Sequence, residues 1–150
     1  MLEFAHQEHV KSYYLDSRNQ TFELPPLTQQ EEADVCVIGA GFFGLSAALE
    51  LAEKGKKVIV LEGGRVGFGA SGRCGGQAIN GFEEGIDEYI AQVGFDKAKQ
   101  LWNMSLEAID IIDERIAKYG IQCDWKKGYA TLALNERRMD DLIEMEKASH

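Results

Sequence analysis

The chain is poor in cysteine, histidine and basic residues, and each shortage excludes a class of protein. Its three cysteines, Cys36, Cys74 and Cys123, are odd in number and far apart, so they form neither a disulfide framework nor a zinc-binding pattern. We expect reduced thiols in a reducing compartment. His6 and His9 have no third ligand nearby, so we predict no metal site.

The charge balance and the lack of long apolar runs exclude further classes. Acidic residues outnumber basic ones, 25 to 16, and no basic stripe exists to neutralise phosphates, so we expect no nucleic-acid partner. No apolar run approaches membrane-spanning length and the first residues lack the pattern of a signal peptide. We therefore expect a cytoplasmic protein with no membrane partner. With 150 residues, 45% of them hydrophobic, the chain is long enough for one domain with a core.

A strand–helix–strand pattern occupies residues 34–62. The short, β-branched run Val35–Ile38 is typical of a strand buried on both faces. The G-x-G-x-x-G motif Gly39–Gly44 follows it, where a strand would give way to a helix. Gly55 predicts the end of that helix, because glycine readily adopts the left-handed conformation. A second strand, Val58–Leu61, comes next, so the sequence predicts a Rossmann-like β-α-β unit of an α/β fold.

The residue types within this unit point to a dinucleotide ligand. Gly39 makes the tight turn, Gly41 lets the backbone approach a pyrophosphate, and Gly44 lets the helix pack closely on the strand. The helix N-terminus offers free N–H groups to phosphate. Glu62, after the second strand, can accept hydrogen bonds from ribose hydroxyls, and its charge disfavours the 2′-phosphate of NADP. The alternative is a β-α-β unit that holds no ligand.

A second glycine-rich stretch follows directly, between residues 63 and 77. Unlike a flexible linker, it also carries charged, aromatic and polar side chains, namely Arg65, Phe68, Ser71, Arg73, Cys74 and Gln77. Glycines let backbone N–H groups crowd around a ligand, while arginine and serine supply donors for phosphate. We therefore predict a loop that embraces a cofactor rather than a flexible connector.

The flanking segments predict an arm and two helices. Residues 1–30 are polar, with Tyr13, Tyr14 and Phe22 as anchors that either cover a domain or partner surface or belong to a partly ordered tail. A short helix is expected at Ile86–Val93.

A long helix is expected from Asp96, as its N-cap, to Gly120. Trp102 and Met104 are expected to pack rather than to contact a cofactor. The acidic residues of this helix fall mostly off its apolar stripe, which predicts a solvated face rather than a catalytic pair. They are Glu107, Asp110, Asp113 and Glu114.

The remaining residues predict a hairpin and a final helix. Ile121–Trp125 and Tyr129–Leu134 are rich in strand-forming residues and are joined by a short turn that contains glycine. Asn135 is a good cap for a helix that continues through Met145.

The chain resembles the D-amino-acid-oxidase-like family of FAD-dependent oxidoreductases. Two features carry the resemblance: the β-α-β unit, and the stretch Gly69–Gln77, which reads Gly-Ala-Ser-Gly-Arg-Cys-Gly-Gly-Gln. Within that family the chain is most similar to the branch that acts on gamma-glutamylated putrescine in bacterial putrescine catabolism. The likeness covers nearly the whole chain. The second glycine-rich stretch is its most specific part, because many nucleotide-binding families share the first motif.

The resemblance implies that FAD is the cofactor. The first motif would hold the diphosphate, Glu62 the adenosine ribose, and Arg65 would lie near the adenine, while the second stretch would run towards the flavin. The implied cofactor-binding residues are Gly39, Gly41, Phe42, Phe43, Gly44, Leu61, Glu62, Arg65, Ser71, Gly72, Arg73, Cys74, Gly75, Gly76 and Gln77. The family usually has asparagine at the position of Cys74, whose thiol is a weaker hydrogen-bonding group. This departure puts cofactor affinity and flavin tuning in question.

The resemblance also implies a larger protein, because members of the family have several hundred residues. We expect this chain to correspond to an N-terminal portion. Residues 1–30 would form the arm, 31–120 the first part of the FAD-binding domain, and 121–150 the hairpin and helix that begin a substrate domain.

The implied reaction of the complete protein is flavin-dependent oxidation of a carbon–nitrogen bond in an amine or amino-acid-like substrate. No side chain here has the spacing of a catalytic acid or base, so we predict cofactor contacts and no catalytic residue. Two alternatives remain open. They are a non-catalytic nucleotide-binding or interaction module, and part of an NAD-dependent dehydrogenase. The sequence predicts no particular oligomeric state.

Overall fold

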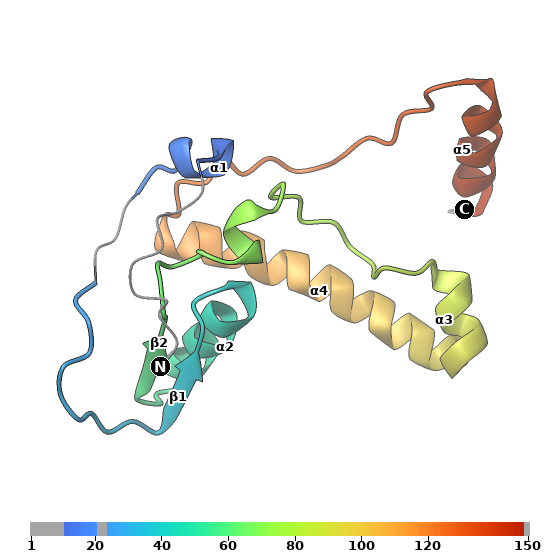
Figure 1. Cartoon of the computed structure of the whole chain (residues 1–150). Helices are drawn as coiled ribbons and strands as arrows, with labels where there is room; N and C mark the ends of the chain where they lie inside the picture. Colours follow the sequence, from blue (N-terminus) through green and yellow to red (C-terminus); the bar gives the residue numbers. More distant parts are fainter. Residues whose placement is uncertain (1–10, 21–23, 149–150) are drawn as a thin grey trace. The chain divides into compact units, whose positions relative to one another are not determined.

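The computed structural model describes residues 11–20 and 24–148. Its elements, in chain order, are α1 (Tyr13–Asp16), β1 (Val35–Ile38), α2 (Phe42–Glu53), β2 (Val58–Leu61), the 3₁₀-helix η1 (Ala70–Arg73), α3 (Ile86–Val93), α4 (Phe95–Tyr119) and α5 (Glu136–Ala148) (Figure 1). These elements divide between two compact units, Met1–Gly120 and Ile121–His150.

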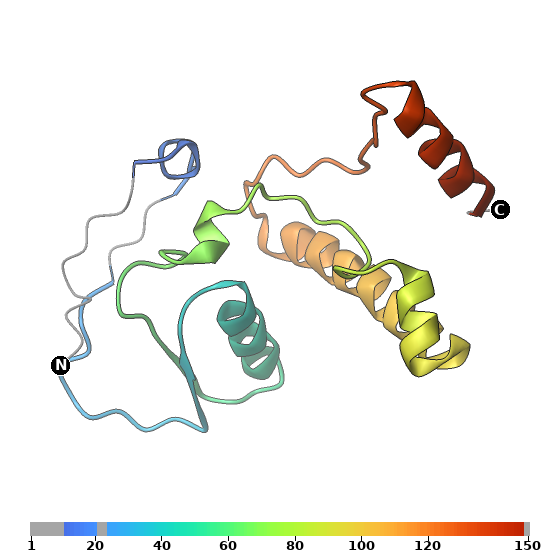
Figure 2. The same ribbon diagram turned by 45° about the vertical axis from the view of Figure 1, so that its right-hand side comes forward.

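The first unit contains a two-stranded parallel sheet with a helix packed on it. β1 and β2 pair in register from Val35 opposite Val58 to Ile38 opposite Leu61. The connecting helix α2 contacts both strands (Figures 1 and 2). Both strands and this helix lie where the sequence predicts them, which confirms the β-α-β unit and its α/β class.

Only one face of β1 is covered in the described part of the chain. Val35 and Val37 are half-buried, and Val37 lies against α2, whereas Cys36 and Ile38 alternate onto the open face. The side chain of Ile38 is 87% exposed. The expectation that this strand is buried on both faces is therefore wrong here. The physical reason is that one helix covers one face of a sheet, and parallel sheets need helices on both sides to bury such runs.

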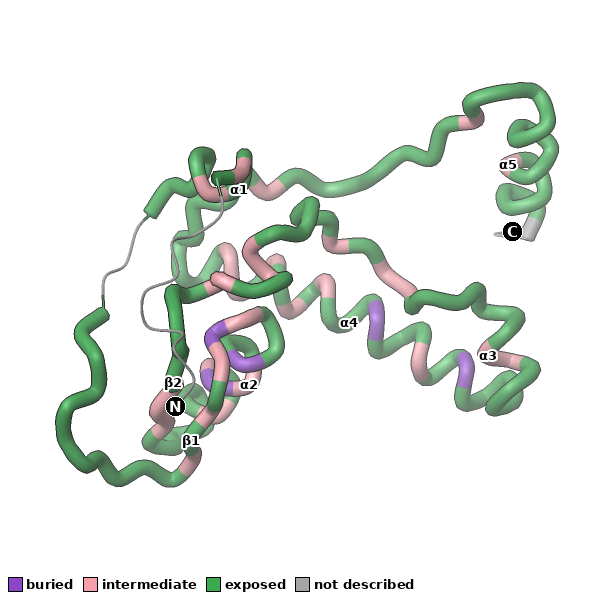
Figure 3. The backbone as a smooth tube through the Cα atoms, in the orientation of Figure 1, coloured by how far each residue is buried: buried purple, intermediate pink, exposed green. Residues whose placement is uncertain are grey.

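The buried residues in the described part of the first unit are small. They are Ala40, Gly44, Ala48, Ala98 and Ser105, and they lie on and beside α2 and on α4 (Figure 3). Small side chains let α2 approach the sheet closely, so the core beneath the glycine motif is made by close backbone contact rather than by large side chains.

The end of α2 and the boundary between α3 and α4 both depend on glycine. Gly55 follows α2 with φ of +77°, as predicted. α3 has its predicted bounds, but α4 begins at Phe95 and Gly94, with φ of +82°, is its N-cap. The prediction that Asp96 is the cap was wrong. Asp96 lies in the first turn instead, where its charge favours the positive end of the helix dipole.

The C-terminal end of α4 and its acidic face lie where the sequence predicts them. Gly120 ends the helix in the left-handed conformation. The predicted solvated face is confirmed, because its acidic side chains are exposed, apart from half-buried Asp113.

Trp102 packs only in part, because 38% of it remains exposed, and Met104 does not pack. Together with Ile86, Ile90, Phe95 and Lys99, the indole of Trp102 lines an open apolar hollow between α3 and α4. Met104 is 61% exposed, so its expected packing role was wrong for this chain.

The second unit contains α5 and no described strand. Residues 121–134 form no ladder, so the predicted hairpin of Ile121–Trp125 and Tyr129–Leu134 was wrong. An isolated two-stranded hairpin is marginal without a further strand or helix to cover its apolar side, and Leu134 is 93% exposed here. Asn135 caps α5 as predicted, because its Oδ1 accepts a hydrogen bond of 3.1 Å from the Arg138 N–H.

The arm contains a short helix that the sequence analysis does not predict. Ser12 caps α1 by accepting a hydrogen bond of 3.3 Å from the Leu15 N–H, and the rings of Tyr13 and Tyr14 meet edge to face at 5.9 Å. Phe22, the third predicted anchor, lies outside the described residues.

Candidate functional site

The first glycine-rich turn continues the sheet before it enters α2. The Gly39 N–H donates to the Leu61 carbonyl at 2.7 Å, and Gly39 then turns with φ of +98°. A residue with a side chain rarely adopts this conformation, so the tight turn predicted for Gly39 is confirmed.

Gly44 sets the distance between α2 and the strand. A Cβ atom added there would lie 2.0 Å from the Gly39 carbonyl oxygen and 3.3 Å from Cγ1 of Val37. No side chain fits in that space, so the close packing predicted for Gly44 is also confirmed.

Glu62 links the end of β2 to both glycine-rich turns. Its Oε2 accepts a hydrogen bond of 2.7 Å from the Ala40 N–H, and its Oε1 accepts one of 3.0 Å from the Gly64 N–H. A carboxylate has about four acceptor positions, so two remain for further donors such as hydroxyl groups. The side chain is exposed and therefore accessible to a ligand.

The second glycine-rich turn lies directly against the first. The Gly67 N–H donates to the Ala40 carbonyl at 3.0 Å, and the Phe42 N–H donates to Oγ of Ser71 at 3.0 Å. A Cβ atom on Gly72 would lie 2.0 Å from the Gly67 carbonyl oxygen, so this turn is tightly folded. Residues 63–73 are thus an ordered loop attached to the start of α2 and not a flexible connector.

The start of α2 has the character of an anion site. Its N-cap, Gly41, has no side chain to accept hydrogen bonds, and among the described residues no acceptor faces the N–H groups of Phe43 and Gly44. These donors and the positive end of the helix dipole favour a phosphate group.

Other predicted site residues are engaged within the second turn or extend beyond it. Nη2 of Arg73 donates to the Phe68 carbonyl at 3.1 Å, and the guanidinium lies 5.5 Å from the centre of the Phe68 ring. Arg65 is exposed, and its carbonyl accepts from the Phe68 N–H. The residues after η1 are exposed; they are Cys74, Gly75, Gly76 and Gln77. In the described chain no hydrogen bond joins these four residues to the first turn. Their cofactor roles stay predictions.

Phe42 and Phe43 offer their backbones rather than a packed aromatic surface. Their side chains are 64% and 88% exposed, respectively. The predicted role of both residues is a backbone contact with the diphosphate. The N–H of Phe43 has no hydrogen-bond partner in the described chain, whereas that of Phe42 already donates to Oγ of Ser71.

Among the described residues, no group of three or more His, Cys, Asp or Glu is close enough together to hold a metal ion. The three histidines lie outside the described ranges. No described helix is both long and apolar enough to cross a membrane.

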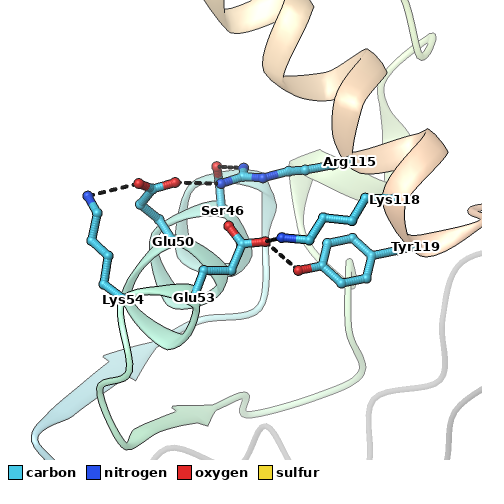
Figure 4. Close-up of polar contacts among 7 residues, drawn as sticks. All are labelled: Ser46, Glu50, Glu53, Lys54, Arg115, Lys118 and Tyr119. Atoms are coloured by element: carbon cyan, nitrogen blue, oxygen red, sulfur yellow. Dashed lines mark hydrogen bonds and ion pairs between the residues drawn. The ribbon is translucent and has the colours of Figure 1, made fainter.

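A polar cluster between α2 and α4 was not predicted from the sequence (Figure 4). Arg115 donates to Oγ of Ser46 at 2.7 Å and to Oε2 of Glu50 at 3.0 Å. Lys118 donates to Glu53 at 2.5 Å. The partners are 65–69 residues apart in the chain, so no local pattern identifies them.

The cluster shifts the pKa values of its members in the directions expected of ion pairs. Hydrogen bonds from Lys118 and Tyr119 lower the pKa of Glu53, and the hydrogen bond to Glu53 raises the pKa of Lys118. The hydrogen bond from Lys54 lowers the pKa of Glu50. The side chains of Glu50, Lys54 and Lys118 are 48–65% exposed, whereas those of Glu53 and Arg115 are 28% and 16% exposed. Solvent therefore screens each pair from at least one side, and the cluster orients α4 on α2 more than it stabilises the fold.

The residues around the two turns fit the adenosine diphosphate part of a dinucleotide. A helix N-terminus with free donors faces outwards, an accessible carboxylate follows β2, and the turn contains glycine where a Cβ atom would collide. The fold and these turns belong to the dinucleotide-binding class of α/β proteins.

Comparison with known proteins gives the family. Residues 34–150 match the family described as FAD dependent oxidoreductase. Over its whole length the chain is 87% identical to the probable oxidoreductase OrdL of Haemophilus influenzae and covers 35% of that protein. It is 44% identical over 140 residues to the gamma-glutamylputrescine oxidoreductase of Escherichia coli, covering 93% of this chain and 33% of that protein. No solved structure matches.

The chain belongs to this family of FAD-dependent oxidoreductases, which confirms the resemblance. It spans about a third of the length of the two relatives. The family is FAD-dependent, which supports FAD as the cofactor rather than NAD.

Proposed function

We propose that this chain forms the FAD-binding start of a flavin-dependent oxidoreductase that oxidises a carbon–nitrogen bond. The observation that carries the proposal is the contact between the two glycine-rich turns. The hydrogen bonds from Gly67 to Ala40 and from Phe42 to Ser71 join them into one surface in front of α2. A single extended ligand can then contact both turns.

Each part of this surface has a proposed role towards FAD. The N–H groups of Phe43 and Gly44 bind the diphosphate, because they are free and lie at the positive end of α2. The remaining acceptor positions of Glu62 bind the hydroxyls of the adenosine ribose. Residues 74–77 continue towards the flavin.

When bound, FAD would supply the redox chemistry, which is the two-electron oxidation of the carbon–nitrogen bond. The residues of this chain bind and orient the cofactor. We assign none of them as a catalytic acid or base, because none has the spacing of a catalytic pair.

A thermal melt of the purified chain with FAD or NAD tests the cofactor. A ligand at 100 times its Kd stabilises a protein by about 2.7 kcal/mol, which is a rise of several degrees in Tm for a chain of this size. We expect FAD to give such a rise and NAD a smaller one. Greater protection by NAD would favour a dehydrogenase. Protection by neither would favour a non-catalytic module.

We further propose a substrate like gamma-glutamylputrescine, supported by the name of the Escherichia coli relative and its 44% identity. A chimera tests this directly. Residues 1–150 would replace the matching stretch of the Haemophilus influenzae relative, to which they are 87% identical. Anaerobic addition of gamma-glutamylputrescine is expected to bleach the flavin absorbance, whereas unmodified putrescine serves as the comparison. Retained flavin that gamma-glutamylated amines do not bleach would contradict the substrate while leaving the cofactor proposal intact.

A further inference from the structure

Helix α2 begins without a cap of its own. Its N-cap position is Gly41, which has no side chain, and no residue next to it in sequence accepts a hydrogen bond from the first turn. The acceptor comes from the second glycine-rich turn instead. Oγ of Ser71, 29 residues along the chain, accepts a hydrogen bond of 3.0 Å from the Phe42 N–H. Ser71 therefore satisfies one of the donors that a helix leaves free at its start.

The absence of a side chain at Gly41 makes room for this serine. A Cβ atom on Gly41 would lie 2.8 Å from Oγ and 3.7 Å from Cβ of Ser71, and apart from the adjoining residues no other part of the described chain lies within 4 Å of it. The same glycine that allows a ligand to approach is thus required by a contact inside the protein.

Ser71 is held in place from both sides of its turn. On one side the Gly67 N–H binds the Ala40 carbonyl of the first turn. On the other, Gly72 approaches Gly67 so closely that a Cβ atom there would lie 2.0 Å from the Gly67 carbonyl oxygen. Ser71 as a whole is half-buried, and its hydrogen bond with Phe42 lies at the surface.

We propose that Ser71 is a positioning residue that caps α2 from the second turn and fixes the spacing of the two turns before any cofactor binds. Its oxygen accepts from Phe42, so its own proton stays available for a second acceptor. If the proposed function holds, that acceptor is a diphosphate oxygen, and this consequence alone depends on FAD binding. The cap itself does not.

Amide hydrogen exchange of the full chain without FAD tests the cap. Loss of an N-cap side chain costs about 1 kcal/mol, so Ser71→Ala is expected to speed exchange of the Phe42 amide about fivefold relative to the amides of β2. Ser71→Thr keeps the hydroxyl and is expected to retain the protection. Equal Phe42 exchange in the wild type and Ser71→Ala, or failure of threonine to restore it, would overturn the proposal.

A double-mutant cycle gives a second, independent test in urea without FAD. Gly41→Ala is expected to lower the unfolding midpoint, and to lower it less when Ser71→Gly has removed the atoms that the new methyl meets. Gly69→Ala is the matched control, because Gly69 has φ of −77° and no atom lies within 4 Å of its Cβ position. Additive effects of the two substitutions would contradict the contact.

The two tests separate this proposal from the proposed function. Unchanged Phe42 exchange together with weakened FAD binding in Ser71→Ala would refute the cap and leave Ser71 as a cofactor contact only. Faster exchange in a chain that binds no FAD would support the cap and refute the cofactor assignment.

Discussion

Gly44→Ala is expected to destabilise the chain, although the same change usually stabilises a helix. Alanine in place of glycine within a helix contributes up to about 1 kcal/mol. Here, however, the new methyl would lie 2.0 Å from the Gly39 carbonyl oxygen, where real Cβ atoms essentially never come closer than 3.0 Å. The Gly39 oxygen belongs to the backbone and the methyl carbon is bonded directly to it, so neither atom can rotate away. Helix α2 must therefore move away from the Gly39 turn by about 1 Å.

The free-energy cost of that separation decides whether Gly44→Ala stabilises or destabilises the chain. Overpacking of a tight contact costs roughly 1–3 kcal/mol, and a clash with backbone belongs at the upper end of that range. The net expectation is a loss of about 2 kcal/mol, or roughly 4–8 °C in Tm for a chain of this length. The buried residues around α2 are Ala40, Gly44 and Ala48, so no large side chain is available to repack.

Far-UV circular dichroism during heating measures this loss, with Gly69→Ala as the control. Gly69 lies in open space with an ordinary φ, so its alanine variant is expected to melt within about 1 °C of the wild type. A Gly44→Ala variant as stable as the wild type, or more stable, would refute the packing argument.

Three further variants test the site and its support. Gly41→Val places a branched side chain against Ser71 and in front of α2, so flavin retention should be lost; flavin content unchanged by absorbance would contradict that placement. Glu62→Ala removes two hydrogen bonds to backbone and the proposed ribose contact, and FAD affinity by fluorescence titration should fall roughly 10- to 100-fold, as for charged hydrogen bonds of about 1.5–3 kcal/mol. Because the pKa of Glu53 lies below its ordinary 4.5, its pairing stabilises the folded chain above that pH and is lost as the pH falls through the folded-state pKa. Glu53→Gln should therefore lower the urea midpoint at pH 7, and by less as the pH falls below 4.5 towards the folded-state pKa. A loss that does not change with pH would show that the charge is not responsible.

Local patterns in the sequence predicted the elements that depend on nearby residues. The β-branched runs Val35–Ile38 and Val58–Leu61, and the helix Ile86–Val93, have the bounds expected of them. These segments carry both their periodicity and their glycine boundaries within a few residues, so no tertiary contact is needed to place them.

The misassigned elements depend on competition or on distant partners. Asp96 has the side chain of a good cap, but Gly94 can adopt a positive φ and ends α3, so the helix begins earlier. The strands expected between residues 121 and 134 have no neighbour to pair with in the described chain.

The contacts that join the site were beyond sequence reasoning for the same reason. Ser71 and Phe42 are both glycine-motif residues, yet nothing in their spacing shows that one caps the other. The pairing of Arg115 with Glu50 joins two helices 65 residues apart. Such contacts depend on the tertiary fold, so they cannot be predicted from local sequence patterns.

Titration of the ¹⁵N-labelled chain with FAD, followed by amide chemical shifts, tests most directly whether both turns hold one cofactor. We expect the amides of Gly39–Gly44 and those of Ser71–Gln77 to shift together, along a single saturation curve. Shifts confined to Gly39–Gly44, with the second turn unaffected at saturation, would contradict the account.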